Sequence, residues 1–586
     1  MKKKLLALIL GVALVMTVMT GCVQLPHYDT FSNEGQDYNR NIFYRNDLTF
    51  GAADPSVIAI TEGDQIGYFY MYCTSDQIGG SGYQAWRSKD LQNWECTGVA
   101  YLPDAESWGL SSLWAPEVIY DEDYMAPGET EPGAYIMFYS ASDRFGQVVN
   151  TSGAIGNWLS IGMAWSKNPQ GPFKQWTGTV PGGIYADGTI YESYNVPISE
   201  PLLAFQRMPE SNPYYDHGTA GAVKVIDASP YIDPDTGKKY LYFCHDLGAG
   251  YKTSEVWGME MKDWHDPDYS TVVKLTHNKR TTVTGTKNDI EEGNVNEAPF
   301  MIKNGDKYYL TFSVFSYTNK SYQVRQAVGD SPLGPFTKVS LNDGGAVIAA
   351  ESSSEYMSGT GHHCFVPVGN ELFIVYHAHQ NRTTGGGQRA IAIDRVFFVK
   401  NDKGDVVLHA NGPTYSIQPL PSAISGYKNI ASKAKVTVTN AYSGDELTYD
   451  NDVSLLTDGI WKSRSLSRVA REFVFNKGES KITMTFDKYT TVRAIMIMNS
   501  YYYDDTFVQI AKIEFKCEKN GMKTKAVINN LAFDWDSHGQ QGVMNPGAAA
   551  IAEFDELKVK EIVITVKCPN ENPEWLAIPE IVVLGK

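Results

Sequence analysis

The segment IDASPYIDPDTGKKYLYFC (residues 226–244) joins two short strand patterns through a turn, and this unit recurs along the chain. Its first half is an apolar run that opens at Asp227, and its second half is an aromatic run after the turn residues 234–237. Similar openings are DPSVI (54–58), WAPEVI (114–119), EAPFMI (297–302) and HHCFV (362–366). The matching aromatic runs are YFYMYC (68–73), AYIMFY (134–139), KYYLTF (307–312) and ELFIVY (371–376).

Five copies of a short-strand unit predict an all-β fold, a five-bladed β-propeller over residues 47–425. No helical periodicity of useful length competes with this interpretation. Stacked β-sandwiches are the alternative, but they do not explain why each unit opens with Asp, Trp, Glu or His. In a propeller the first strand of every blade lines one central channel, so these opening residues would converge. The long excursion at 121–226 is expected to form a lid or a pocket wall.

Three carboxylates open units of the repeat: Asp54, Asp227 and Glu297. Gathered in one cavity they would repel each other, which raises at least one pKa. Cleavage of a glycosidic bond needs one carboxylic acid to protonate the leaving oxygen and one carboxylate to activate water, and a third can orient the acid. For any one of them alone, the alternative is a strand-end cap or a turn residue. Aligned on the prolines, Asp227 falls one position before Glu297, and Glu117 follows its proline and is expected beside the site.

The motifs ADPSV (53–57), LWAPE (113–117), IDASPYID (226–233), NEAPF (296–300) and GTGH (359–362) together resemble the signatures of glycoside hydrolase family 43. The resemblance covers about 45–425 and implies a five-bladed propeller that hydrolyses arabinosides, xylosides and some galactosides with inversion. By motif it implies that Asp54 is the general base, Asp227 the pKa modulator and Glu297 the general acid. Inversion would place Asp54 and Glu297 roughly 6.5–9.5 Å apart, leaving room for water.

Three further residues are candidates for substrate or metal binding. Trp114 could stack on a sugar ring or pack in the core. Arg389 matches a family arginine that reaches the active site, and the alternative is a surface charge on a closing strand. His362, which His363 follows directly, matches a family histidine near the propeller axis that in several members binds a cation, often calcium; a structural histidine is the alternative. One imidazole is a poor calcium site, since calcium prefers six to eight oxygens, and the acid/base chemistry itself requires no cofactor.

The C-terminal residues 426–586 lack the repeat and form a second predicted module. Alternating runs such as KITMTF (481–486), VRAIMIMNS (492–500) and EIVITVKC (561–568) predict an antiparallel β-sandwich. The motifs LTDG (456–459) and IPEIVVL (578–584) look like those of a discoidin-type, galactose-binding-like jelly roll. That fold often serves as a carbohydrate-binding module, but a binding role does not follow from the fold alone.

The N-terminal residues 1–22 are predicted to be a targeting segment. Three lysines at 2–4 precede an apolar run over 5–19, which is short for a membrane span. The ending TGC (20–22) resembles a bacterial lipobox in which Cys22 is lipidated, and ordinary signal cleavage beside an incidental cysteine is the alternative. Residues 23–46 would be a linker. The expected product is an exported lipoprotein, held by its acyl chains at the cell surface or in the periplasm.

Charge and cysteine spacing narrow the expected partners. The chain has 50 Lys and Arg against 67 Asp and Glu, a net charge of −17, and loss of the three N-terminal lysines makes it 47 − 67 = −20. An acidic chain lacks the positive field that holds a phosphate backbone, which disfavours nucleic acid. The six cysteines after Cys22 lack metal-site spacing and are expected to be buried free thiols, with disulfides as the alternative. A monomer is expected, and it would reach the membrane only through its lipid anchor.

Two functions from different classes are compatible with these patterns. The first is an exported inverting glycosidase acting on plant-type polysaccharide, as an α-L-arabinofuranosidase or, alternatively, as a β-xylosidase, endo-arabinanase or galactan-active enzyme. The second is a non-catalytic surface lipoprotein that binds glycans. The complete set of Asp54, Asp227 and Glu297 favours the enzyme. The sequence also lacks the G-x-S-x-G, H-E-x-x-H and P-loop signatures of other catalytic classes.

Overall fold

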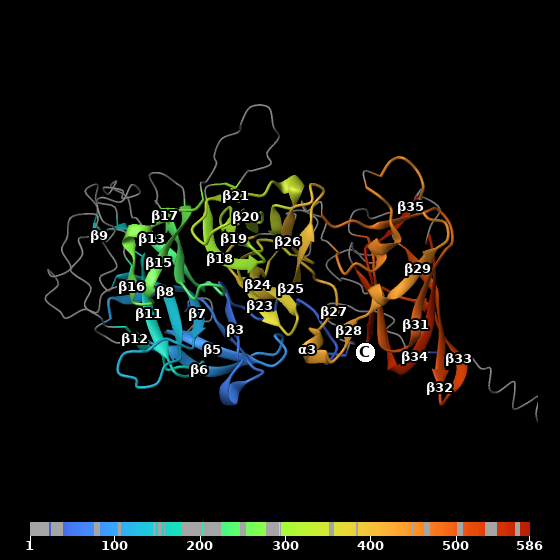
Figure 1. Ribbon diagram of the computed structural model, residues 1–586, viewed down its shortest axis with the longest axis horizontal. Coiled ribbons are helices and arrows are strands. Elements are labelled where there is room, and N and C mark those ends of the chain that lie inside the picture. Colours follow the sequence, from blue (N-terminus) through green and yellow to red (C-terminus); the bar gives the residue numbers. More distant parts are fainter. Residues whose placement is uncertain are drawn as a thin grey trace, which may run out of the picture. The chain divides into compact units, whose positions relative to one another are not determined.

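The computed structural model describes residues 23–24, 39–75, 82–103, 107–143, 148–149, 155–156, 159–176, 202–203, 224–246, 254–276, 292–293, 295–350, 357–381, 385–447, 449–461, 469–500, 508–533, 548–568 and 575–586. Strands and turns dominate these residues, so the expectation of an all-β fold is confirmed (Figure 1). The chain divides into two compact units. One comprises Leu48–Pro413 and Ser465–Val469, and the other comprises Met1–Asp47, Thr414–Arg464 and Ala470–Lys586.

The unit that starts at Leu48 is a five-bladed β-propeller, as the repeat predicts. Each blade is an antiparallel sheet with its strands in chain order from the centre outward. Blade 1 has β3 (Ser56–Ala59), β4 (Phe69–Tyr72), β5 (Tyr83–Ser88) and β6 (Glu95–Tyr101), and blade 2 has β7 (Gly109–Asp121), β8 (Ala134–Asp143), β11 (Leu159–Ser166) and β12 (Lys174–Gln175). Blade 3 has β13 (Lys224–Ile232), β14 (Lys239–Asp246), β15 (Ser254–Asp263), β16 (Asp266–Pro267) and β17 (Val273–Lys274). Blade 4 has β18 (Asn296–Asn304), β19 (Lys307–Val314), β20 (Gln323–Gly329), β21 (Phe336–Lys338) and β22 (Ala346–Ile348), and blade 5 has β23 (Gly361–Val368), β24 (Glu371–His379), β25 (Arg389–Lys400) and β26 (Val406–Ala410).

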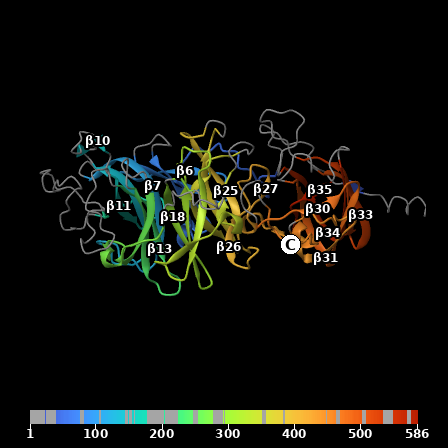
Figure 2. The same cartoon turned by 90° about the horizontal axis from the view of Figure 1, so that it is seen from above.

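The first strands of the five blades close a ring. β3 contacts β7, β7 contacts β13, β13 contacts β18, β18 contacts β23, and β23 contacts β3 again. Figures 1 and 2 show the blade sheets from two directions. The opening residues of the five sequence repeats therefore converge at the centre of the propeller, as the repeat predicts.

The aromatic runs of the sequence are the second strands of the blades, and they hold neighbouring blades together. Because side chains alternate along a strand, β14 turns Leu241 and Phe243 toward an apolar cluster with blade 2. Tyr240 and Tyr242 of the same strand face a cluster with blade 4. Full burial of one such side chain contributes about 1.5–3 kcal/mol. The apolar contacts between blades thus fix where the first strands lie.

The other unit is also built from β-strands. An eight-stranded sheet has the order β1 (Val23–Gln24), β33 (Met522–Leu531), β32 (Gln509–Lys519), β34 (Ala549–Lys567), β31 (Ser480–Met498), β36 (Ile581–Gly585) and β28 (Lys428–Asn429), with β29 (Ala434–Val438) also paired to β31. Strands β30 (Phe473–Asn476) and β35 (Trp575–Ile578) form a separate pair, as do β2 (Phe43–Tyr44) and β27 (Gln418–Pro419), and the short helix α3 covers Ser422–Ser425. Residues of β30, β31, β32, β34 and β35 share one apolar core. The second β-module is confirmed, and its jelly-roll class stays a prediction.

Several expectations concern residues that are not described. The signal segment with Cys22, and most of the excursion at 121–226, lie outside the described residues, so both stay predictions. Cys73, Cys244, Cys364 and Cys517 are buried free thiols, as expected, whereas Cys96 is exposed and Cys568 is partly exposed. Within the described part of the chain, no helix has the length and hydropathy to cross a membrane.

Candidate active site

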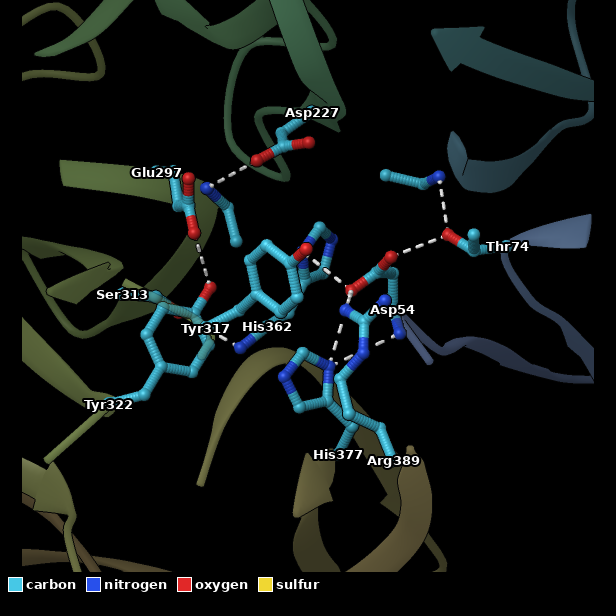
Figure 3. Close-up of polar contacts among 12 residues, drawn as sticks. Asp54, Thr74, Asp227, Glu297, Ser313, Tyr317, Tyr322, His362, His377 and Arg389 are labelled. Atoms are coloured by element: carbon cyan, nitrogen blue, oxygen red, sulfur yellow. Dashed lines mark hydrogen bonds and ion pairs between the residues drawn. The ribbon is translucent and has the colours of Figure 1, made fainter. Parts of the chain in front are cut away.

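A residue with left-handed backbone conformation recurs in every blade, at or just before the first strand. The φ angles are 54° at Asp54, 43° at Ala115, 56° at Asp227, 50° at Ala298 and 44° at His362. In blades 2 to 5 the pairing with the second strand shifts register at this point. Such a β-bulge redirects the side chain that it carries. Figure 3 shows the result, in which Asp54, Asp227, Glu297 and His362 converge from different blades.

Aligning the blades on their left-handed residues gives a different order from aligning them on their prolines. Asp54, Asp227 and His362 are the left-handed residues of their own blades, whereas Glu297 lies one residue before Ala298, the left-handed residue of blade 4. Asp227 therefore falls one position after Glu297, and the proline-based order was wrong. The reason is that the proline follows Asp54 directly but follows Asp227 only after two residues, because the bulge does not require proline at a fixed offset.

Hydrogen bonds between blades hold each bulge. The N–H of Ala115 donates to Thr74 Oγ1 at 3.0 Å, that of Asp227 to Ser140 Oγ at 3.1 Å, and that of His362 to Ser313 Oγ at 2.9 Å. The Asp54 N–H donates to His377 Nδ1 at 3.3 Å, and the Ala298 N–H donates to Asp227 Oδ2 at 3.0 Å. These five bonds join each blade to the next around the whole ring. Buried backbone N–H groups need such partners, so the links stabilise an otherwise unfavourable conformation.

Asp54 is held as a carboxylate by cationic and hydrogen-bonding neighbours. Its Oδ1 lies 2.9 Å from Arg389 Nη1 and 3.2 Å from Nδ1 of both His362 and His377. Its Oδ2 accepts a hydrogen bond from Thr74 Oγ1 at 2.5 Å. Burial alone would raise the pKa of Asp54, but Arg389, His362 and His377 together hold this pKa well below its usual range. Asp54 is thus ionised across the physiological pH range.

The surroundings of Asp227 shift its pKa in the opposite direction. Burial, opposed by His362 and reinforced by Glu297 and Asp54, raises the pKa of Asp227 to about 7. Its Oδ2 accepts the Ala298 N–H, so the carboxyl binds the peptide directly after Glu297. At mildly acidic pH Asp227 carries a proton, while Asp54 does not. Two neighbouring carboxyls with separated pKa values are a frequent property of acid/base sites.

Glu297 is oriented by a buried tyrosine. Tyr322, at 1% exposure, donates its hydroxyl to Glu297 Oε1 at 2.8 Å. The Tyr322 ring stacks on His377, with centroids 5.5 Å apart and planes at 10°. His377 in turn contacts Asp54, so one chain of contacts runs from Glu297 through Tyr322 and His377 to Asp54 (Figure 3). Glu297 and Asp54 lie on opposite sides of this cluster in Figure 3.

His362 and His363 are adjacent in sequence, but their side chains have different surroundings. His362 faces the cluster through Nδ1, whereas His363 is buried inside the blade with Nε2 2.7 Å from Thr311 Oγ1. Burial and the neighbouring His362 lower the pKa of His363 to about 3, so His363 is neutral. Among the described residues, no three His, Cys, Asp or Glu side chains group as a metal site, and the carboxylate oxygen beside His362 already binds Arg389. These residues do not supply the oxygen ligands of calcium. Calcium at His362 stays a prediction.

The remaining candidates lie on the same strands. Arg389, 8% exposed, pairs with Asp54, so it belongs to the site and is not a surface charge. Trp114 occupies in blade 2 the position of Glu297 in blade 4, its carbonyl accepts the Tyr83 hydroxyl at 3.1 Å, and its sugar-binding role stays a prediction. Glu117 lies two residues beyond the Ala115 bulge, and burial, partly offset by a Ser56 hydrogen bond, raises the pKa of Glu117 to about 8.

A family model described as glycosyl hydrolases family 43 matches residues 45–193 and 206–403, which is more than half of the chain. The chain belongs to glycosyl hydrolases family 43. The two matched segments cover all five blade openings, including Asp54, Asp227, Glu297 and His362. The predicted family membership is therefore confirmed, and the chain is a family 43 glycosidase.

Individual relatives show moderate similarity. A β-D-galactofuranosidase of Aspergillus niger is 23% identical over 346 residues, 58% of this chain and 78% of that protein. An extracellular endo-α-(1→5)-L-arabinanase of Thermotoga petrophila is 26% identical over 208 residues, 31% of this chain and 36% of that protein. The crystal structure of a thermostable family-43 glycoside hydrolase has 28% identity, covers 64% of this chain and 99% of its own, and gives a TM-score of 0.47.

Sequence reasoning missed four side chains of this family 43 site: Thr74, His377, Tyr322 and Tyr317. A signal for two of them exists. The residue that follows each six-residue aromatic run is Thr74, Ser140, His245, Ser313 or His377, and in four blades it accepts the next bulge N–H. Tyr317 and Tyr322 lie in a loop after β19, and the repeat contains no pattern that marks them.

Proposed function

We propose that this family 43 enzyme hydrolyses glycosidic bonds with inversion, with Asp54 as general base and Glu297 as general acid. The observation that carries the proposal is that the pKa values of Asp54 and Asp227, in one cluster, are shifted in opposite directions. Arg389 and Thr74 donate to the Asp54 carboxylate and its pKa is held well below the usual range, whereas the pKa of Asp227 is raised to about 7. An ionised base and a second carboxyl that can carry a proton can act on a water and on a leaving oxygen in one step.

Each carboxyl then has a separate task. Asp54 takes a proton from water as the water attacks the anomeric carbon, and Arg389 and Thr74 hold its two oxygens in place. Glu297 gives its proton to the departing oxygen, and Tyr322 keeps its carboxyl oriented. Asp227 binds the Ala298 peptide and thereby positions Glu297, and its own charge, once ionised, would help Glu297 to keep its proton. No step depends on a metal ion at His362.

The substrate is proposed to be a plant-type polysaccharide or an oligosaccharide of it, and the cleaved unit an α-L-arabinofuranosyl group. The arabinanase and galactofuranosidase relatives support a furanoside, although their identities of 26% and 23% leave β-xyloside and galactan as alternatives within the family. An acidic chain of −17 suits a neutral glycan better than an anionic one. A non-catalytic glycan-binding protein is the alternative from another class, and it would not need the separated carboxyl pKa values.

The test is a panel of substrates with product analysis. Purified protein is incubated with nitrophenyl α-L-arabinofuranoside, β-D-xyloside and β-D-galactofuranoside, and with arabinan, xylan and galactan. Release of one sugar is expected, and proton NMR within the first minutes should show the anomer opposite to that of the substrate. Retained configuration would refute the assigned roles of Asp54 and Glu297. Absence of turnover on all six substrates, together with measurable glycan binding, would favour the non-catalytic alternative.

Replacing Tyr322 with phenylalanine is expected to shift the pH–rate profile. The hydroxyl of Tyr322 stabilises the ionised form of Glu297, so its loss makes Glu297 hold its proton to higher pH. The alkaline limb of kcat/KM should move upward by about one to two units, because one hydrogen bond to a charged group contributes a net of about 1.5–3 kcal/mol and one pKa unit corresponds to about 1.4 kcal/mol. The acidic limb should stay in place. Tyr309→Phe, in the second strand of the same blade but away from the carboxyls, is the matched control, and an equal shift there would contradict the assignment.

A further inference from the structure

An exposed tyrosine lies at the carboxyl cluster and has no role in the chemistry above. Tyr317, in the loop between β19 and β20, is 43% exposed. Figure 3 shows its ring within the same group of side chains as Asp54, His362 and Arg389. The guanidinium carbon of Arg389 lies 4.7 Å from the ring centroid, and Arg389 itself pairs with Asp54. One face of the ring is therefore occupied by a cation that belongs to the active site.

The backbone of Tyr317 is fixed by a buried histidine of another blade. His379 Nε2 donates to the Tyr317 carbonyl at 2.6 Å, because a carbonyl oxygen can only accept. The other ring nitrogen, Nδ1, then accepts from the Ser358 hydroxyl at 3.1 Å. Burial lowers the pKa of His379, so the ring is neutral and keeps this tautomer. A fully buried, neutral imidazole that spans two blades is a rigid support for an exposed loop residue.

A second bond between blades holds the same loop. The Gly359 N–H of blade 5 donates to the Lys320 carbonyl at 3.0 Å, and the Phe315 N–H donates to the Glu292 carbonyl at 2.9 Å. The loop also ends at Tyr322, whose hydroxyl binds Glu297. The position of Tyr317 relative to both Asp54 and Glu297 is thus determined at several points along a short segment. A binding surface that is held rigid before the ligand arrives costs less ordering entropy on binding.

We propose that Tyr317 is a sugar-binding platform, on which a neutral furanose or pyranose ring of the glycan packs its C–H face beside the scissile bond. The inference rests on the proposed function and names a specificity-determining residue for it. The exposed surface of the aromatic ring can pack against apolar C–H groups. Its other face already makes a cation–π contact with Arg389. A sugar in this place would also cover the Arg389 guanidinium and shield it from bulk water.

The test measures binding separately from catalysis. In a Glu297→Gln background, α-1,5-linked arabinotriose and β-1,4-linked xylotriose are titrated calorimetrically into the full chain with Tyr317, Tyr317→Phe, Tyr317→Trp or Tyr317→Leu. We expect Phe and Trp to bind the preferred trisaccharide within about three-fold of tyrosine, and Leu to weaken it about ten-fold, which corresponds to the contribution of an aromatic face. Leucine keeps an apolar cover over Arg389 but has no ring. It therefore distinguishes packing of the sugar on an aromatic ring from simple shielding of Arg389. Ile66→Ala, at an exposed apolar residue of blade 1, should bind normally.

Kinetics on the otherwise wild-type chain supply the second readout. Tyr317→Leu should raise KM for the trisaccharide with kcat nearly unchanged and with both limbs of the pH profile in place. Equal affinity of the Leu and Tyr forms, or failure of both trisaccharides to bind, overturns the platform. A moved acidic limb at unchanged KM also overturns it, since Tyr317 would then act only through Arg389 and Asp54. Binding that depends on Tyr317 in a chain without turnover would retain the platform and reject the hydrolase, so the two failures are distinguishable.

Discussion

Replacing Asp54 with asparagine should lower kcat by at least about 10³-fold on every substrate, whatever its leaving group, because the attacking water then lacks a base. Asparagine preserves the shape and can still accept from Thr74, but it removes the negative charge that Arg389, His362 and His377 surround. Three polar groups would then be left around a neutral amide. The measurement is steady-state kinetics on an activated aryl glycoside and on the natural glycan.

Two controls make the Asp54 result interpretable. Asp330→Asn removes a carboxylate that pairs with Lys307 at the exposed surface, and such pairs contribute little, so its activity should equal wild type. Thermal unfolding of Asp54→Asn shows whether the propeller persists. Substantial turnover by a folded Asp54→Asn protein would rule out Asp54 as the base.

Replacing Glu297 with glutamine should produce a loss that depends on the leaving group. The amide cannot donate a proton, so cleavage of the natural glycan should fall by about 10²–10⁴-fold. A dinitrophenyl glycoside, whose aglycone departs without protonation, should lose far less. The measurement is a series of aryl glycosides of graded phenol acidity, in which kcat should depend steeply on the phenol pKa for the variant and weakly for the wild type.

The matched control for Glu297 is Glu260→Gln, which removes a carboxylate bound to Lys238 at the outside of blade 3 and should leave the series unchanged. A Glu297→Gln enzyme that cleaves the natural glycan near the wild-type rate would show that another group supplies the proton. Asp227 would be the next candidate, since it is the neighbouring carboxyl that titrates near pH 7.

The repeat was sufficient to predict the propeller and the convergence of Asp54, Asp227 and Glu297, because blade order follows chain order and first strands meet at the axis. It was insufficient for the partners of these residues. Tyr322 reaches Glu297 from the end of an irregular loop, and Arg389 reaches Asp54 across a separation of 335 residues. Such contacts depend on how blades 4, 5 and 1 close, which is a property of the assembled ring. The proline-based register was wrong for a local reason, since a bulge is a backbone conformation that several residue types adopt.

The five hydrogen bonds at the bulges have a consequence for how activity is lost. Asp54 and Asp227 belong to the carboxyl cluster and are also the left-handed residues of their blades, so the hydrogen bonds that hold them in place are also bonds that join blade to blade. A partly opened ring cannot retain an intact set of carboxyls. During heating or denaturant titration, catalytic competence and circular closure should therefore disappear in one cooperative transition, with no folded but inactive propeller populated between them.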